Sequence, residues 1–215
     1  MSYYFPEGSK LFFSNTFASP KTVTGVSNAH PAVATSVAHG FADGDELLFT
    51  SGWEDATDSV FKADQLTADT LGLLGLNTLN QSFFPAGTGT GTLAKVSNWT
   101  EMPQVLGISP SGGDARFTTI SPLAKRNDIN VPTGFNAMSL TITMGHDPDN
   151  ANYQTMVDIS RTLSKVAFKL VLSGGATAYG YGYMSVSEVP QMSKGQANQV
   201  NAAITFLGRF ISYGS

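Results

Sequence analysis

The fold is decided by the stretch Ser139-Leu140-Thr141-Ile142-Thr143-Met144-Gly145-His146-Asp147-Pro148-Asp149-Asn150, in which a strand pattern gives way to the start of a helix. Apolar and hydroxyl residues alternate over its first half, as in a strand with one buried face. Asp147 is expected to cap a helix that begins at Pro148, where the missing proline N–H has no cost. The stretch therefore predicts a half-buried strand followed directly by a helix.

The predicted helix spans about 148–163. Its buried stripe follows the i, i+3, i+4, i+7 spacing through Tyr153, Met156, Val157 and Ser160, and Leu163 extends it. Such a stripe packs against an apolar surface, which the preceding strand supplies. We expect the following residues to form the core of the subunit: Leu140, Ile142, Met144, Tyr153, Met156 and Val157.

Further strand patterns lie on both sides of this strand and helix. They cover 99–108, 116–123, 165–172, 178–186 and 200–210. Residues 109–114 are expected to form a turn, residues 124–134 an irregular mobile loop, and residues 187–198 a polar loop. Many strands and one helix predict a mainly β fold, a β-sandwich or barrel with one flanking α-helix.

The first half of the chain has shorter patterns. One strand, 10–13, is expected in an N-terminal arm. Glycine, asparagine and aspartate turns then separate five more candidates, which are 22–26, 32–37, 46–50, 60–66 and 70–76. A Gly–Thr repeat over 86–92 marks a boundary. We therefore divide the chain into an arm (1–21), a small inserted β module (22–96) and a core (97–215).

The composition is unusual for a folded chain. Only 13% of the 215 residues are charged, about half the roughly 25% typical of globular domains. Polarity comes instead from 22 Ser, 22 Thr and 12 Asn, and the 41% hydrophobic fraction is enough for a core. Either an assembly covers much of the surface, or hydroxyl and amide groups alone keep the chain in solution.

Several functional classes are excluded by composition and spacing. A net charge of -4 argues against binding nucleic acid by neutralising phosphates. Without cysteine there is no disulfide or zinc–thiolate site, and His30, His39 and His146 lack metal-ligand spacing. The acidic residues lie mostly in turns, and no nucleophile–base motif occurs. No catalytic residue, cofactor, metal or membrane partner is expected, and no signal peptide.

A stripe of alternate tyrosines, Tyr179, Tyr181 and Tyr183, admits two interpretations. An aromatic row can bind sugars or stacked bases. It can also cover a core or a contact between subunits. Gly180 and Gly182 on the opposite face permit close backbone approach, which favours the structural interpretation.

The order of these elements resembles the tail tube proteins of long, non-contractile-tailed bacteriophages. The resemblance rests on the motifs Ser111-Gly112-Gly113-Asp114, Thr118-Thr119-Ile120 and Asp147-Pro148-Asp149-Asn150, and on the closing strands. The segment from Thr22 to about Val96 is similar to a small β module inserted in such phage proteins. Its motifs are Asn28-Ala29-His30-Pro31-Ala32-Val33, residues 38–45 and residues 66–71.

The resemblance implies a structural virion protein. Hexameric rings would stack into a hollow tail tube, through which double-stranded DNA passes during ejection without specific binding. Partners would be further copies of the chain and the tape measure, terminator and tail-tip proteins, with assembly in the bacterial host cytoplasm. The inserted module would lie on the outer wall, where it leaves the channel open.

Contacts between rings are expected from the arm and from the loop 124–134, ordering only on assembly. The candidate ring–ring contact residues are Phe12, Phe13, Lys125, Arg126, Asn127 and Asp128. An alternative function is a tail-tip or fibre adhesin, a carbohydrate-binding β-sandwich that uses the tyrosine stripe. A sheath or baseplate component and an enzyme are weaker alternatives, because closing strands and low charge suit a tube.

Overall fold

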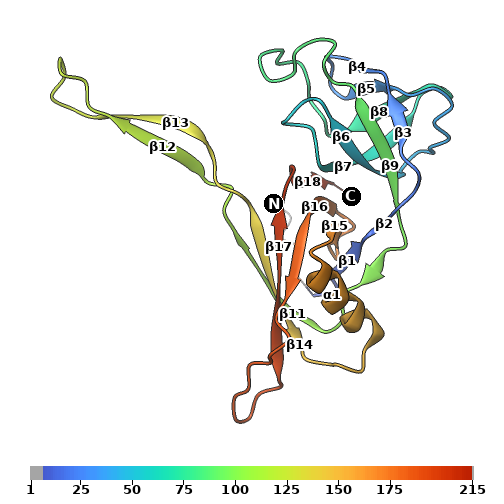
Figure 1. The fold of residues 1–215 in the computed structure, drawn as a ribbon, viewed down its shortest axis with the longest axis vertical. Coiled ribbons are helices and arrows are strands. Elements are labelled where there is room, and N and C mark those ends of the chain that lie inside the picture. The colour runs from blue at the N-terminus through green and yellow to red at the C-terminus, as the bar shows by residue number, and fades with distance from the viewer. Residues whose placement is uncertain (1–6, 215) are drawn as a thin grey trace.

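The computed structural model describes residues 7–214 and confirms a mainly β fold with one helix (Figure 1). It contains two large antiparallel sheets and a separate hairpin. The core sheet consists of β1 (Lys10–Ser14), β10 (Thr100–Glu101), β11 (Val105–Ser111), β14 (Ser139–Gly145), β15 (Lys165–Val171), β16 (Thr177–Val186), β17 (Gln199–Phe206) and β18 (Ile211–Tyr213). The hairpin consists of β12 (Ala115–Ile120) and β13 (Ile129–Phe135).

The core sheet has the strand order β10-β1-β15-β16-β17-β14-β11, and β18 pairs with β16. Its two outermost strands, β10 and β11, are joined by only three residues, 102–104. The sheet must therefore curl until its edges approach each other. This shape lies between an open sandwich and a closed barrel.

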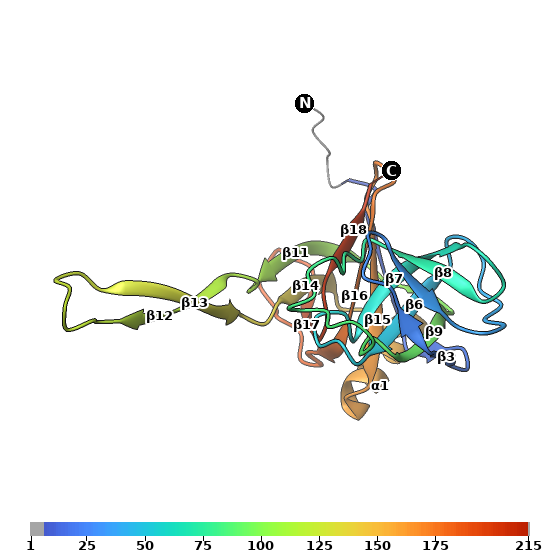
Figure 2. The same cartoon turned by 90° about the horizontal axis from the view of Figure 1, so that it is seen from above.

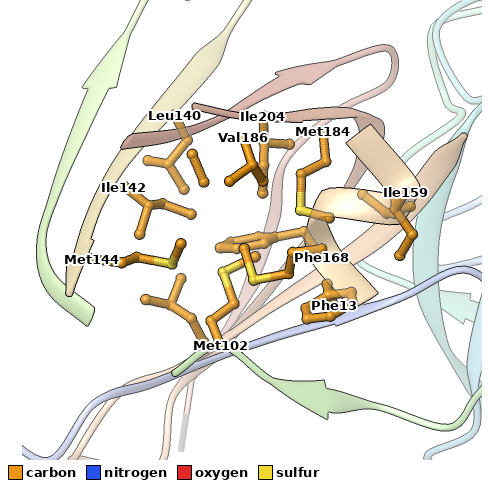
Figure 3. Close-up of a cluster of buried hydrophobic side chains, with 14 of the residues drawn as sticks. Phe13, Met102, Leu140, Ile142, Met144, Ile159, Phe168, Met184, Val186 and Ile204 are labelled. Atoms are coloured by element: carbon orange, nitrogen blue, oxygen red, sulfur yellow. The ribbon is translucent and has the colours of Figure 1, made fainter. Parts of the chain in front are cut away.

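The concave side of the core sheet holds the larger hydrophobic core (Figure 3). Alternate residues of each strand point into it, as strand geometry requires. Met102 lies in the short connection between the two edge strands, and its side chain belongs to this core. Helix α1 (Ala151–Thr162) packs on β16 and adds Tyr153, Met156, Val157 and Ile159.

Helix α1 begins later than the sequence predicts. Its N-cap is Asn150, not Asp147, because the Asn150 side-chain oxygen accepts hydrogen bonds from the backbone N–H groups of Asn152 and Tyr153. Residues 147–150 form a turn instead, closed by the Asn150 N–H and the Asp147 carbonyl. Leu163, expected on the buried stripe, is the exposed left-handed C-cap.

Replacing the N-cap gives a direct test of this helix start. Asn150→Ala removes the acceptor of two helix N–H groups and is expected to lower the free energy of unfolding by about 1 kcal/mol. Asp147→Ala is the matched control, because it removes the hydrogen bond from the Gln104 side chain but no helix cap. It should lower the free energy of unfolding by less than Asn150→Ala does. Chemical denaturation of the two variants compares them, and an equal or larger loss for Asp147→Ala would contradict the assignment.

The second sheet belongs mostly to residues 22–96, called the module below. This second sheet contains β2 (Thr16–Phe17), β3 (Lys21–Val23), β4 (Gly25–Val26), β5 (Ala32–Thr35), β6 (Glu46–Ser51), β7 (Ser59–Gln65), β8 (Thr70–Leu74) and β9 (Gly91–Ser97). Its strand order is β2-β9-β6-β7-β8-β5-β4, with β3 paired to β9. It encloses a core of its own around Trp53, Phe49 and Phe61. Trp53 is 2% exposed, and its indole N–H donates to the Pro85 carbonyl at 2.9 Å.

Several local predictions differ from the structure. Residues 99–108, expected to form one strand, are divided between β10 and β11 by residues 102–104. Residues 129–134, expected in a mobile loop, belong to β13, because Ile129 and Val131 pair with β12. Residues 109–111, expected in a turn, continue β11, and the turn falls on Gly112 and Gly113, which have positive φ. The Gly–Thr repeat over 86–92, expected to be a loop at a boundary, runs into β9, which begins at Gly91. The last long strand ends at Phe206, not at residue 210.

The expected N-terminal arm is not free within the described residues. Its predicted strand exists as β1, but β1 lies inside the core sheet, paired with β10 and β15. β1 is therefore ordered without assembly. The first six residues of the arm lie outside the described part of the chain.

Candidate assembly surfaces

The hairpin of β12 and β13 projects away from the rest of the subunit (Figures 1 and 2). Within the described part of the chain its two strands pair only with each other, and every residue of both strands except Gly134 is exposed. An isolated two-stranded hairpin is marginally stable in water. A partner that covers the hairpin would stabilise it.

Apolar side chains cover the hairpin. The large exposed ones are Phe117, Ile120, Leu123, Ile129, Val131 and Phe135. Phe117 is 58% exposed and Phe135 is 76% exposed. Contiguous apolar surface on a soluble protein marks a contact site.

The hairpin tip carries four of the predicted ring-contact residues: Lys125, Arg126, Asn127 and Asp128. All four are exposed. Asp128 accepts a hydrogen bond from the Ser121 hydroxyl at 2.6 Å, and the Lys125 N–H donates to the Pro122 carbonyl at 3.0 Å. The tip is therefore a compact turn that presents two cations at the far end of the projection.

The other two predicted contact residues lie on β1, far from the tip in the fold. Phe13 is 1% exposed and belongs to the hydrophobic core, so its prediction as a ring contact was wrong. The alternation along β1 explains this, because Leu11 and Phe13 share the inward face. Phe12 is partly exposed, between Glu101 of β10 and Lys169 of β15.

The six residues expected in the subunit core lie together. Leu140, Ile142 and Met144 on β14 join Tyr153, Met156 and Val157 on α1 in one buried cluster. Each is at most 9% exposed. The strand and the helix that the sequence places in succession thus line one interior.

Within residues 7–214, the opposite side of β11, β14, β17 and the second half of β16 is uncovered and carries only uncharged residues. This open polar face comprises Gly107, Ser109, Ser111, Ser139, Thr141, Thr143, Tyr183, Ser185, Gln199, Asn201, Ala203 and Thr205, which the strand register places side by side. Thr143 donates to the Asn201 side-chain oxygen at 3.2 Å. The strands present a continuous surface of hydroxyl and amide groups.

The module covers the remaining part of that side, over β15 and β16. Leu48, Val60 and Val96 of the module meet Tyr179 and Tyr181 of the core sheet in a third buried cluster. Figure 2 shows the module and the hairpin on opposite sides of the core. The module is therefore packed against the core sheet and not merely tethered to it.

Charge complementarity accompanies this contact. Eight of the 16 acidic residues of the chain, but only two of its 12 basic residues, lie between residues 22 and 96. Three of those acids pair with core cations across the interface: Glu46 with Lys169 at 2.6 Å, Asp55 with Arg209 at 3.4 Å and Asp58 with Lys165 at 3.8 Å. In every pair the module supplies the carboxylate.

Glu46 is the centre of this interface. Its carboxylate accepts hydrogen bonds from the Lys169 ammonium, from the Tyr179 hydroxyl at 2.7 Å and from the Trp99 indole N–H. Burial and the hydrogen bond to Glu46 raise the pKa of Tyr179 above its ordinary value. The tyrosine therefore stays a neutral donor to the carboxylate.

The tyrosine stripe is mostly buried. Tyr179 is 1% exposed, Tyr181 is 7% exposed and Tyr183 is 40% exposed. A Cβ at Gly182 would lie 2.0 Å from the Thr205 carbonyl oxygen, so the neighbouring strand requires glycine there. These contacts favour the structural interpretation of the stripe over a ligand-binding one.

Tyr181 predicts a measurable response to alkaline pH. Burial, with Asp58 and Tyr183 nearby, raises its pKa to about 12, against about 10 in an unfolded chain. The stability it contributes is complete below pH ~10 and is lost as pH rises from there toward 12. Between these two pH values the melting temperature of Tyr181→Phe should therefore fall less than that of wild type. An equal fall in the two proteins would contradict this prediction.

The three histidines have structural surroundings. His39 is 2% exposed, and its Nδ1 accepts the Phe41 N–H at 3.0 Å, which shapes its turn as the sequence suggests. His30 precedes Pro31, and His146 lies against Tyr153. Within residues 7–214, no group of three or more potential ligands is placed to hold a metal ion. In the same range, no helix has the length and apolar character of a membrane span.

Comparison with known proteins gives the family. Residues 51–215 match the model of the family described as phage tail tube protein, TTP. One similar solved structure is described as a hybrid structure of the SPP1 tail tube by solid-state NMR and cryo EM. It has 15% sequence identity and a TM-score of 0.43, and the match covers 55% of this chain and 70% of that chain. Comparison with curated proteins gives no match. The match to the family model spans well over half of the sequence, and the chain therefore belongs to the phage tail tube protein family.

Proposed function

We propose that this chain assembles into hexameric rings that stack into a phage tail tube, and that the tube conducts double-stranded DNA during ejection. The observation that carries the proposal is the projecting hairpin. Its apolar side chains have no partner within the described subunit that could bury them. A second copy of the chain would supply that partner and stabilise the hairpin.

The open polar face has the extent that a tube wall requires. Four strands lying side by side in each of six copies would give a wall of roughly 24 strands, which at about 4.8 Å per strand has a backbone diameter of about 37 Å. Strand tilt widens such a barrel, and side chains narrow the bore by about 10 Å in all. A duplex of about 20 Å fits such a bore.

Closing the ring also protects an exposed strand edge. β11 lies at one edge of the core sheet, and no other described strand pairs with its outer side. Exposed strand edges recruit other chains indiscriminately, and a ring satisfies them with a defined neighbour.

The module is placed on the outer wall in this proposal. It packs on β15 and the first half of β16, which the curl of the core sheet turns away from the open polar face, and it lies across the core from the hairpin (Figure 2). The interior then remains open, and the tape measure, terminator and tail-tip proteins would meet the tube from the bore or the ends. Assembly would take place in the cytoplasm of the bacterial host.

Electron microscopy of the purified, concentrated chain tests the proposal. Hollow tubes or rings with six-fold symmetry are the expected result. Monomers at every concentration, with affinity for glycans on an array, would instead favour the adhesin alternative. Burial of Tyr179 and Tyr181 already leaves that alternative without its expected binding surface.

A further inference from the structure

Resting on the proposed function, we infer that the module builds a receptor for the hairpin of a neighbouring copy. The receptor is a groove between the module and the core sheet, with Glu54 on its module wall and Phe206 and Phe210 on its core wall. The occupant is the hairpin tip, residues 120–128, of a second copy. The module then takes part in the contact between copies, in addition to lying on the outer wall.

The groove forms where two parts of the chain meet. It has a volume of about 620 Å³, a size typical of clefts that bind a ligand. Its core wall is the connection between β17 and β18, and Leu207 in that connection is 43% exposed. Met138, at the base of the hairpin, adds further apolar surface. The module contributes Glu54 and Asp55, so the groove has an acidic wall only when the module is docked.

The acidic wall is fixed relative to the core wall. Trp53, the neighbour of Glu54 in the chain, is buried in the hydrophobic core of the module. A Cβ at Gly208 would lie 2.1 Å from the Asp58 carbonyl oxygen, so the backbones of the core and the module touch there. The groove is therefore formed before a partner arrives, which lowers the entropic cost of binding one.

Charge complementarity selects the hairpin as the occupant. Residues 115–135 contain three basic residues and one acidic residue, whereas residues 51–58 contain three acidic residues and no basic one. Asp55 and Asp58 already pair with core cations, which leaves Glu54 for a partner. Within residues 7–214, no ion pair engages Glu54, Lys125 or Arg126. The two surfaces therefore offer each other the charges that each subunit leaves unpaired.

The hairpin tip also matches the apolar lining of the groove. Leu123 at the tip is fully exposed, and Ile120 is 50% exposed. The hairpin projects away from its own subunit, so its tip lies far from the groove that Phe135 borders at its base (Figures 1 and 2). A contact between two different surfaces of identical copies repeats from copy to copy and generates a ring or a helical stack.

A second exposed apolar loop, residues 187–198, is a poorer match for the groove. It exposes Val189 and Met192, but it carries one acidic and one basic residue and therefore no net charge. Its acidic residue, Glu188, is already paired with Arg161. Only the hairpin combines exposed apolar side chains with an excess of unpaired cations among these two segments.

Charge reversal on each side, alone and together, tests the contact in the full chain. Glu54→Lys places a cation on the groove wall, and Lys125→Glu with Arg126→Glu places two carboxylates on the tip. A triple variant combines all three changes. Asp149→Lys is the matched control, because Asp149 is another exposed acid but lies just before α1. The readout is the lowest protein concentration at which tubes sediment and are seen by electron microscopy.

Wild type and Asp149→Lys should form tubes at the same concentration. Glu54→Lys and the double variant of the tip should each need at least about tenfold more protein, because like charges then face each other across the contact. The triple variant should return to within about threefold of wild type, because opposite charges meet again. The melting temperature of every variant should stay within about 3 °C of wild type, since only exposed positions change.

Cross-linking provides a second measurement, of proximity. The chain contains no cysteine, so Glu54→Cys and Lys125→Cys each introduce a single thiol. Tubes assembled from a mixture of these two variants, one of them carrying a size tag, should give disulfide-linked heterodimers on mild oxidation. A mixture of Asp149→Cys and Lys125→Cys should give none.

Failure of the proposed function and failure of this inference are distinguishable. Absence of wild-type tubes would overturn both. The inference alone would be overturned if wild type forms tubes and any one of three results is obtained: Glu54→Lys assembles at the wild-type concentration, the triple variant recovers nothing relative to the double variant, or no heterodimer forms between positions 54 and 125.

Discussion

Removal of the hairpin is expected to abolish tube formation and leave the subunit folded. The variant lacks residues 115–135 and joins Asp114 to Asn136 through two glycines. The Asn136 N–H already donates to the Asp114 carbonyl at 2.9 Å, so the two ends of the deletion are neighbours in the native fold. No residue of the hairpin belongs to the three buried hydrophobic clusters.

Two measurements separate assembly from folding. The melting temperature of the deletion variant should stay within about 3 °C of wild type, because no buried core is lost. Electron microscopy at the concentration where wild type forms tubes should show single subunits only. Phe83→Ser is the matched control, because Phe83 is equally apolar and 62% exposed but belongs to the module. Tubes formed by the deletion variant would show that the hairpin is not the contact between copies.

Loss of Glu46 is expected to be the most damaging single charge change in the chain. Glu46→Ala leaves the Lys169 ammonium, 2.6 Å from the carboxylate in wild type, without its counter-ion at a largely buried site. Breaking one side of a buried pair costs about 3–5 kcal/mol. For a domain of this size that corresponds to a fall in melting temperature of about 6–20 °C.

Controls assign the effect to the buried interface. Glu101→Ala removes the exposed pair between Glu101 and Lys10, 3.1 Å apart, and should cost no more than about 1 kcal/mol. Glu46→Gln keeps an acceptor for Tyr179, and its melting temperature should lie between those of Glu46→Ala and Glu101→Ala. Protease cleavage between residues 97 and 101 should increase in Glu46→Ala as the module loosens. Equal melting temperatures for Glu46→Ala and Glu101→Ala would show that this network does not hold the module.

The interior of the subunit could be predicted from sequence because its signals are local. Alternation at Leu140, Ile142 and Met144 and helical spacing at Tyr153, Met156 and Val157 each report one buried face. Both lie in the core that the structure shows. The start of the helix was misplaced, because aspartate and asparagine are both good caps and only tertiary contacts choose between Asp147 and Asn150.

The surfaces were harder to predict. β13 contains Pro132, a residue that argues against an interior strand, and both of its faces are exposed. Pro132 is tolerated because β13 is a strand of an isolated hairpin, next to the register shift between Arg116 and Phe117. Ile129, Val131 and Phe135, at alternate positions, were the signal that could have identified it. Phe12 and Phe13 were grouped by proximity in sequence, although adjacent strand residues point to opposite faces.

The open polar face and the docking of the module depend on contacts between distant segments. Ser109, Thr141 and Ala203 come from three strands, and no local pattern brings them together. The same holds for Glu46 and Lys169, which are separated by 123 residues. The scarcity of charge was visible in the composition, but the strand register was needed to show which surface lacks it.

A reconstruction of the assembled tube measures the central claim most directly. The expected map shows six subunits per ring, with Thr141 and Asn201 facing the bore, the module outside, and each hairpin covered by another copy. A map with the module in the bore, with the open polar face turned outward, or with hairpins free in solvent would contradict this arrangement.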